Sequence, residues 1–297
     1  MAKINSLHIN AYERDLKIRN RSPRTAQNYR ETLLQLSAFV GEADLLELSR
    51  TEVEGYILHV LETRSAASAS GRYRALRAFN NWAVREELVP VSPMAKMTPP
   101  KVVEKPIPVV PDQALKLLLA ECSGTDFESR RDTAIIRLWC EPGSPRVSEV
   151  AGMTVDDIDQ VLDLVKLLGK GGRVRVIPFG AKTGQALYRY LRARKDHPLA
   201  KGGSEALWLG ARGKALTASG LYQMLERRAR QAGIGHIHPH QLRHTSAHNW
   251  RVAGGSESDA MVLFGWVSPE MPRRYGRSAE VERAQTAARR ISPADRL

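Results

Sequence analysis

The most restrictive feature of the chain is a proline-rich segment that spans residues 91–112 and reads VSPMAKMTPPKVVEKPIPVVPD. Proline stands at positions 93, 99, 100, 106, 108 and 111. Each proline removes a backbone hydrogen-bond donor and disfavours helix at the residue before it. We therefore expect an extended linker over residues 93–111, which separates an N-terminal domain (1–92) from a C-terminal domain (112–297).

The N-terminal domain is expected to be entirely helical. Ser22 and Pro23 precede an apolar-periodic run that ends at Val40, and similar patterns predict helices over 50–62 and 66–87. In the third helix a basic stripe alternates with aromatic and aliphatic residues; its members are Arg72, Arg74, Arg77 and Arg85. The stripe fits a solvated amphipathic face or a surface along DNA phosphates. We expect Arg72, Arg74 and Arg77 to bind DNA.

The C-terminal domain mixes helices with strands, so the fold class is mainly α with a small β-sheet. The sequence from 161 to 180 predicts two strands around the Gly-rich turn Lys170-Gly171-Gly172. A short inward-packed helix is expected around Val147–Met153, and a short helix should carry Tyr275. Further helices are predicted at about 112–121, 128–140, 183–195, 217–232, 240–253 and 279–290.

Charge and composition narrow the partners. The formal net charge is +13 and the isoelectric point is about 10.0, so the chain attracts polyanions, although a basic protein without a nucleic-acid role has the same charge. The sequence has neither an apolar run of membrane-span length nor the apolar core of a signal peptide. Cys122 and Cys140 lie outside zinc or Cys-x-x-Cys spacing and are expected to be reduced and structural. We predict a cytoplasmic, nucleoid-associated protein without membrane contact.

A dispersed set of polar residues has the chemistry of phosphoryl transfer to a tyrosine. Two arginines can clamp a phosphate, a lysine and a histidine can move protons, and a tyrosine can attack phosphorus. The residues are Arg146, Lys170, His240, Arg243 and Tyr275. Taken singly, each also fits a bland role: an ion pair of Arg146 with Glu149, a solvated lysine in a turn, or a packed tyrosine.

The histidine-rich segment HIHPHQLRHTSAH offers a rival chemistry. His240, His244 and His248 are four residues apart and share a helix face, as metal ligands can. Gln241 occupies the place of the glutamate in the zinc motif His-Glu-x-x-His, and no cysteine is near. We therefore expect no metal and no other cofactor, and a zinc hydrolase remains an alternative.

Order and spacing together carry a resemblance to a known family. The chain contains, in order, Arg146-Val-Ser-Glu149, Gly169-Lys170-Gly171, His240-Gln-Leu-Arg243-His244, Gly265-Trp266 and Tyr275. Over residues 112 to 280 it resembles the tyrosine recombinase (phage integrase) family, as a two-domain, Xer-like or integrase-like member. The helical N-terminal part looks like the SAM-like core-binding domain of that family, and the C-terminal part looks like its catalytic domain.

The resemblance implies a role for each matched residue. Tyr275 would attack the scissile phosphodiester and form a 3′-phosphotyrosyl link, while Arg146 and Arg243 hold the non-bridging oxygens. Lys170 would protonate the leaving 5′-oxygen, and His240 would assist proton transfer at the tyrosine. Trp266 would donate its indole N–H to the phosphate. Arg173 and Arg274 flank this set and are expected to contact DNA.

Two departures from the family pattern concern the positions of Arg146 and Tyr275. The stretch Gly143-Ser144-Pro145-Arg146 has one residue more than the family usually has, which could displace Arg146. Pro272 stands three residues before Tyr275, so the helix that carries Tyr275 would begin later or be kinked. We expect activity to survive both departures.

The implied function is site-specific recombination of double-stranded DNA, for integration, excision or dimer resolution. The family architecture implies a tetramer on paired sites, with a partner recombinase or accessory protein as a further option and no additional arm-binding domain. The residues after Tyr275 would either dock on a neighbouring protomer or remain a solvated terminus. The main alternative is a catalytically impaired DNA-binding protein on the same fold. A type IB topoisomerase shares the chemistry but fits the two-domain layout less well.

Overall fold

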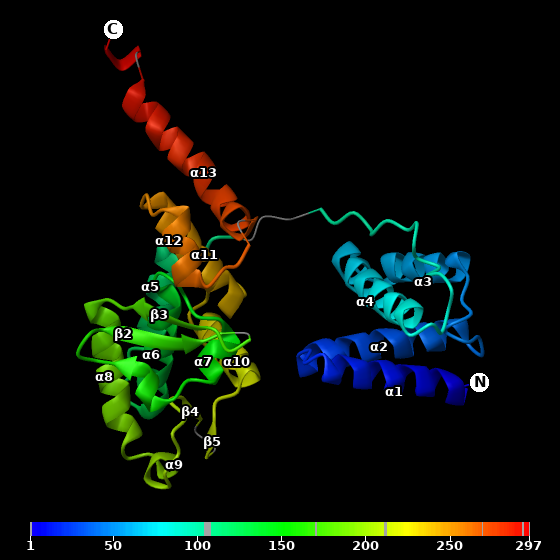
Figure 1. Cartoon of the computed structure of the whole chain (residues 1–297). Coiled ribbons are helices and arrows are strands. Elements are labelled where there is room, and N and C mark those ends of the chain that lie inside the picture. The colour runs from blue at the N-terminus through cyan, green and yellow to red at the C-terminus, as the bar shows by residue number, and fades with distance from the viewer. Residues whose placement is uncertain are drawn as a thin grey trace. The chain divides into compact units, whose positions relative to one another are not determined.

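The computed structural model describes residues 2–103, 108–169, 171–210, 213–268, 270–292 and 294–296, with the backbone alone at 2–3, 273–278, 281 and 296. The chain divides into two compact units, Met1–Lys105 and Pro106–Leu297. It is mostly helical with small antiparallel sheets, as the sequence predicted (Figure 1).

The first unit is a bundle of helices α1 (Ala2–Ile18), α2 (Pro23–Val40), α3 (Arg50–Thr63) and α4 (Ala66–Arg85). The last three begin at serine caps whose hydroxyls accept backbone N–H groups: Ser22, Ser49 and Ser65. The core gathers side chains from every helix, including the aromatic cluster of Tyr12, Phe79 and Trp82. After α4, Met94 is fully buried in this core and the Tyr73 hydroxyl donates to the Met97 carbonyl at 2.6 Å.

The basic stripe of α4 divides into distinct environments. Arg74 and Arg77 are exposed, on the side of the helix opposite its buried aromatic residues. Arg72 is half-buried and donates to the Thr32 hydroxyl at 2.7 Å. Arg85 pairs with Asp15 at 2.8 Å and with Glu86 at 3.0 Å. Arg74 and Arg77 are therefore the members that present their charge most directly to solvent.

The second unit surrounds a short antiparallel sheet with helices. Strand β1 (Ile158–Asp159) pairs with β2 (Leu164–Leu168), which pairs with β3 (Val174–Pro178); Val165 faces Ile177 across the β2–β3 pair. A second small sheet joins β4 (Leu209–Gly210) to β5 (Lys214–Ala215). The helices are α5 (Asp112–Glu121), α6 (Phe127–Cys140), α7 (Val147–Ala151), α8 (Ala181–Arg194), α9 (Pro198–Lys201), α10 (Ala218–Gln231), α11 (Pro239–Val252), α12 (Glu257–Phe264) and α13 (Glu270–Ile291), with 3₁₀ turns at Val155–Asp157 and Ala294–Arg296.

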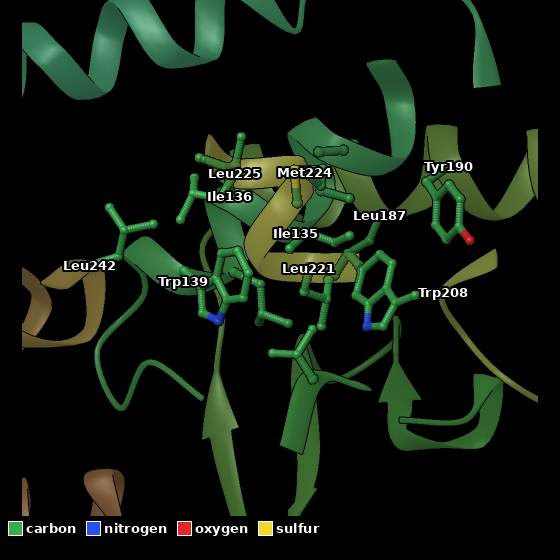
Figure 2. Close-up of a cluster of buried hydrophobic side chains, with 14 of the residues drawn as sticks. Ile135, Ile136, Trp139, Leu187, Tyr190, Trp208, Leu221, Met224, Leu225 and Leu242 are labelled. Carbon is green, nitrogen blue, oxygen red and sulfur yellow. The ribbon is translucent and has the colours of Figure 1, made fainter. Parts of the chain in front are cut away.

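Helix α6 is the central element of the second unit. Its residues Ile135, Ile136 and Trp139 are fully buried, and Figure 2 shows them among side chains from α8, α10 and α11. The β2–β3 pair contributes Val165, Leu167 and Ile177 to the same core. This core fixes α7, α11 and the sheet relative to one another, and these elements carry the candidate site.

The sequence reading missed some elements and divided another. It did not anticipate α1, α12, β4 or β5, because these are short or have weak apolar periodicity. Two separate helices were expected around Tyr275 and over 279–290, and this was wrong: α13 is one helix of 22 residues. Gly276 alone does not stop a helix, and no proline follows until Pro293.

None of the described helices is long and apolar enough to cross a membrane. Cys122 and Cys140 are both free, and burial raises the pKa of each thiol to about 12. A thiol with so high a pKa is a weak nucleophile, in agreement with a structural role.

Candidate active site

Three arginines meet at the C-terminal end of α12. Arg175 Nε donates to the Leu263 carbonyl at 2.9 Å, and Arg146 Nη2 donates to the Gly265 carbonyl at 3.3 Å. Arg243 Nη2 donates to the carbonyl between them, that of Phe264. The last carbonyls of a helix lack intrahelical partners and carry the negative end of its dipole, so they attract cations. Residues from α7, β3 and α11 thereby converge on one short turn.

Glu149 links two of these arginines. Its carboxylate accepts from Arg146 Nη1 at 2.8 Å and from both terminal nitrogens of Arg175 at 2.7 and 2.8 Å. It also accepts the Arg146 backbone N–H at 2.7 Å and so caps α7. Burial opposes ionisation of this carboxyl, but the hydrogen bonds from Arg175 and Arg146 outweigh it and lower the pKa to about 2. Glu149 is thus an anion that fixes Arg146 in place.

The strap 143–146 turns the chain into this cluster. Gly143 has φ +85°, and a Cβ there would lie 2.7 Å from Ile177 Cγ2 and 2.8 Å from the Leu263 carbonyl oxygen. Ser144 is fully buried; its N–H donates to the Glu141 carbonyl at 2.9 Å, and its own carbonyl accepts from Arg243 Nη1. The additional residue of the strap therefore supplies an acceptor for Arg243, and Arg146 still reaches the α12 end.

Aromatic stacking holds the turn after α12. The Trp266 and Phe264 rings are stacked, with their centroids 4.7 Å apart. The guanidinium of Arg243 also lies over the Phe264 ring, 5.1 Å from its centroid. Gly265 between them is left-handed (φ +60°), and a Cβ there would meet Arg175 Cδ at 3.2 Å. Gly265 thus allows the tight turn at which both Trp266 and Arg243 contact the Phe264 ring.

The first turn of α11 carries His240 and Arg243 with opposite exposure. His240 is exposed, whereas Arg243 is buried beneath it. The helix begins at His238, whose Nδ1 accepts the Gln241 N–H at 3.1 Å, and Pro239 occupies the next position. Burial lowers the pKa of His238, and the neighbouring His236 lowers it further. The cap therefore uses a neutral imidazole.

Helix α13 carries Tyr275, for which the structure describes the backbone only. Pro272 is the third residue of this helix, within the first turn, where backbone N–H groups have no intrahelical acceptor. The expectation of a later start or a kink was therefore wrong with regard to the start: α13 begins at Glu270, before Pro272. Farther along, His248 Nε2 of α11 lies 3.3 Å from the carboxylate of Glu282. This contact ties α13 to the helix that carries His240 and Arg243.

Some predicted residues cannot be placed. Lys170 lies outside the described residues, as does the side chain of Arg274, while Arg173 is exposed beside the β2–β3 turn. Among the residues the structure does describe, no group of three could hold a metal ion. His244 and His248 are buried while His240 is exposed, so the three histidines face different surroundings.

Arg175 is the contact that sequence reasoning missed. It lies on β3, two residues before Ile177 and therefore on the same inward-facing side of the strand, and only 9% of its side chain is exposed. An arginine at an inward strand position needs a buried anion. The alternation in RVRVIP therefore contained a signal for a structural ion pair, and Glu149 is its partner.

The chain matches two family models. The model of the phage integrase family covers residues 109–282, and that of the phage integrase N-terminal SAM-like domain covers residues 9–87. Each match falls within one of the two compact units.

Known proteins agree with these matches. The chain is 30% identical to tyrosine recombinase XerC of Corynebacterium efficiens, over 86% of this chain and 81% of that protein. It is 32% identical to tyrosine recombinase XerC of Mycobacterium bovis, over 92% of this chain and 94% of that protein. The structure of the Tn1549 transposon integrase in complex with transposon right-end DNA has a TM-score of 0.75 at 18% identity, over 96% of this chain and 99% of that one, which shows a shared fold.

Proposed function

The chain belongs to the phage integrase family of tyrosine recombinases and is a site-specific DNA recombinase; from this premise we propose that Tyr275 is its nucleophile and that Arg146 and Arg243 bind the scissile phosphate. One observation carries the assignment of the arginines. They come from the N-cap of α7 and from α11, and they converge on adjacent carbonyls beside Trp266. Such convergence of two guanidiniums is what a phosphate with two non-bridging oxygens requires.

In the proposed reaction the Tyr275 hydroxyl attacks the phosphorus of one DNA strand. The new bond joins phosphorus to the tyrosine oxygen, and the bond that breaks joins phosphorus to the 5′-oxygen. His240 accepts the tyrosine proton, and Lys170 gives a proton to the departing 5′-oxygen. Attack by a 5′-hydroxyl of the partner strand reverses these steps and rejoins the DNA. The energy of the phosphodiester is kept in the covalent link, so the exchange needs no nucleotide cofactor.

The surroundings of the arginines support their electrostatic role. Arg243 is fixed by two carbonyls and an aromatic ring, and Arg146 is fixed by Glu149, so neither guanidinium has to reorganise when charge develops on the phosphate. The Arg146 side chain is 39% exposed, which leaves it open to a ligand. Trp266 adds an indole N–H donor at the same turn.

The assembly is a further part of the proposal. Cutting and rejoining two duplexes requires four strand breaks, so we propose four protomers on paired sites, with DNA held by the exposed Arg74 and Arg77 of α4 and by Arg72, Arg173 and Arg274. A partner recombinase could supply two of the four protomers. Solved structures with the same fold include complexes with DNA, for example XerH site-specific recombinase bound to a palindromic difH substrate, which supports double-stranded DNA as the ligand here. The proposed compartment is the nucleoid region of the cytoplasm.

A catalytically impaired DNA-binding protein is the rival. It drew support from the additional residue at Ser144 and from Pro272. Ser144 now has a defined role as an acceptor for Arg243, and Pro272 stands where a helix tolerates proline. Both features favour an active enzyme.

Covalent trapping tests the proposal. The full chain is incubated with nicked duplexes from its genomic neighbourhood, in the presence of a metal chelator and without ATP, and denatured complexes are resolved by electrophoresis. A protein–DNA adduct is expected with the native chain and not with Tyr275→Phe. Tight binding without an adduct would favour the impaired protein, most clearly if deleting Ser144 or replacing Pro272 restored cleavage.

A further inference from the structure

A groove between α6 and α8 has an unusual concentration of positive charge. Its cavity has a volume of about 630 Å³, and its cationic lining consists of Arg130, Arg137, Lys182, Arg189 and Arg192. None of the described lining residues is acidic. We call this cavity the α6–α8 groove. A concave surface with charges of one sign concentrates the electric field and raises the local density of counter-ions.

These five cations are not neutralised within the part of the chain that the structure describes. None of them forms an ion pair there, and Arg192 instead lies over the Tyr188 ring at 5.8 Å. On the other side of α6 the arginines do form ion pairs. Arg131 of α6 and Arg228 of α10 both pair with Asp132, at 2.7 and 2.8 Å. No ion pair among the described residues therefore offsets the repulsion between the groove cations, and a bound polyanion would reduce that repulsion.

The groove lies apart from the candidate active site. Arg130, Thr133 and Arg137 share one face of α6, since they are three and four residues apart. Asp132 lies on the opposite face and binds Arg228 of α10, which Figure 1 shows across α6 from α8. No residue of the groove belongs to the cluster around Glu149. Binding of the scissile phosphate therefore does not account for the charge of the groove.

We propose that the α6–α8 groove binds the sugar–phosphate edge of a second stretch of DNA, outside the stretch held at the active site. Arginine predominates in the groove, and its planar fork binds phosphate with two hydrogen bonds. Arg130 and Arg137 are seven residues apart, as are Lys182 and Arg189, so each row extends about 10 Å along its helix. A DNA strand presents about three phosphates over that length. The hydroxyls of Ser123 and Thr125 in the groove lining add neutral donors of the kind that contact phosphates.

The inference rests on the proposed function, because the DNA is that of a recombinase, but its test does not depend on cleavage. The variant Lys182→Gln/Arg189→Gln removes two exposed groove charges. The control Lys195→Gln/Lys201→Gln removes two exposed charges that do not line the groove. Affinity of the full chain for a long duplex of arbitrary sequence is measured against salt concentration, since phosphate contacts carry no sequence information.

The groove variant is expected to make the negative slope of log affinity against log salt shallower by about 1.8, which corresponds to the loss of two phosphate contacts. The slope of the control should stay close to that of the native chain. Adduct formation on a duplex that ends at the boundaries of the recombination site should remain intact in the groove variant. Equal slopes for variant and control would overturn the proposal, as would loss of the adduct together with binding. Retention of a poly-glutamate peptide by the native chain, abolished by the groove variant with no change in DNA slope, would point instead to an acidic protein partner.

Discussion

Arg146 and Arg243 donate hydrogen bonds to adjacent backbone carbonyls, those of Gly265 and Phe264, although one arginine caps α7 and the other lies in α11. The end of α12 thus acts as a common reference point for both guanidiniums. The relative positions of the arginines then depend on three supports: the Glu149 carboxylate, the Gly143 turn and the His238 cap. Changing each support should have an effect on stability or pH dependence that differs from the effect of removing an arginine.

The first prediction concerns Glu149→Gln. This change leaves Arg175, with 9% of its side chain exposed, without an anionic partner and loosens Arg146. Unfolding by urea should show a loss of about 3–5 kcal/mol in the free energy of unfolding, with a decrease in adduct yield. Glu226→Gln, which breaks only the exposed pair with Arg230, should cost less than about 0.5 kcal/mol. Similar losses for both variants would contradict the role of Glu149.

The same carboxylate predicts an acid limit of stability. The pKa of Glu149 falls from 4.5 to about 2 on folding, so its contribution is complete above pH 4.5 and is lost as the pH falls toward 2. Urea titrations of the native chain and of Glu149→Gln should therefore converge in that interval. A constant difference between the two chains from neutral pH down to pH 2 would contradict this linkage.

Gly143→Ala tests the strap. The new methyl would lie 2.7 Å from Ile177 Cγ2 in a backbone conformation with φ +85°, so we expect a destabilisation of about 3 kcal/mol. Gly171→Ala is the matched control, because φ is +77° there and no atom of the described, non-adjacent residues lies within 4 Å of the added Cβ. The control should show backbone strain alone, about 1 kcal/mol. Thermal unfolding of both variants separates the steric clash from the strain, and equal effects would mean that no clash exists.

His238 predicts a pH dependence of stability that is separate from the proton transfer proposed for His240. Its Nδ1 must be unprotonated to accept the Gln241 N–H, and its pKa in the folded chain lies below 6.5. The cap contribution is therefore present above pH 6.5 and is lost as the pH falls through that value toward the lower folded pKa. His238→Asn keeps a capping oxygen without a titrating group and should remove this part of the pH dependence.

His238→Ala should cost about 1 kcal/mol at pH 8 and less at pH 5, as measured by chemical unfolding. An alanine variant whose deficit is unchanged by pH, or an asparagine variant that keeps the full pH dependence, would exclude the cap as its source.

Pro272→Ala should change the free energy of unfolding by less than about 0.5 kcal/mol, because the first turn of α13 has no hydrogen bond at that position to restore. Ala284→Pro in the middle of the same helix should reduce the helix content measured by circular dichroism. It should also lower the free energy of unfolding by about 3 kcal/mol. A large gain in stability or adduct yield for Pro272→Ala would instead mean that this proline strains the helix.

The sequence anticipated the elements with strong periodicity or clear caps. The helix from Pro23 to Val40 was found because its apolar period and its serine cap agree. The β2–β3 hairpin was found because two apolar runs flank a glycine-rich turn. The sequence did not indicate that α13 is one continuous helix, because its apolar residues are sparse and give no clear period. The hub at Glu149 could be predicted only in part: an arginine three residues away is a local signal, but the second partner, Arg175, arrives through strand pairing.

The resemblance identified the family from five ordered motifs, and the family models bear this out. Individual roles are a different matter, since an arginine that clamps phosphate and one that supports a neighbour look alike in sequence. Arg175 and Arg243 both bind carbonyls of the α12 end, yet Arg175 gives its terminal nitrogens to Glu149. Burial and partner identity, which only three-dimensional contacts supply, separate the two cases.

The most direct test of the central claim is peptide mapping of the covalent adduct by mass spectrometry. After trapping on a nicked site and digestion with nuclease and protease, the account predicts one modified peptide, with a 3′-nucleotidyl phosphate on Tyr275. A modification on any other residue, or recombination without a covalent intermediate, would contradict the account.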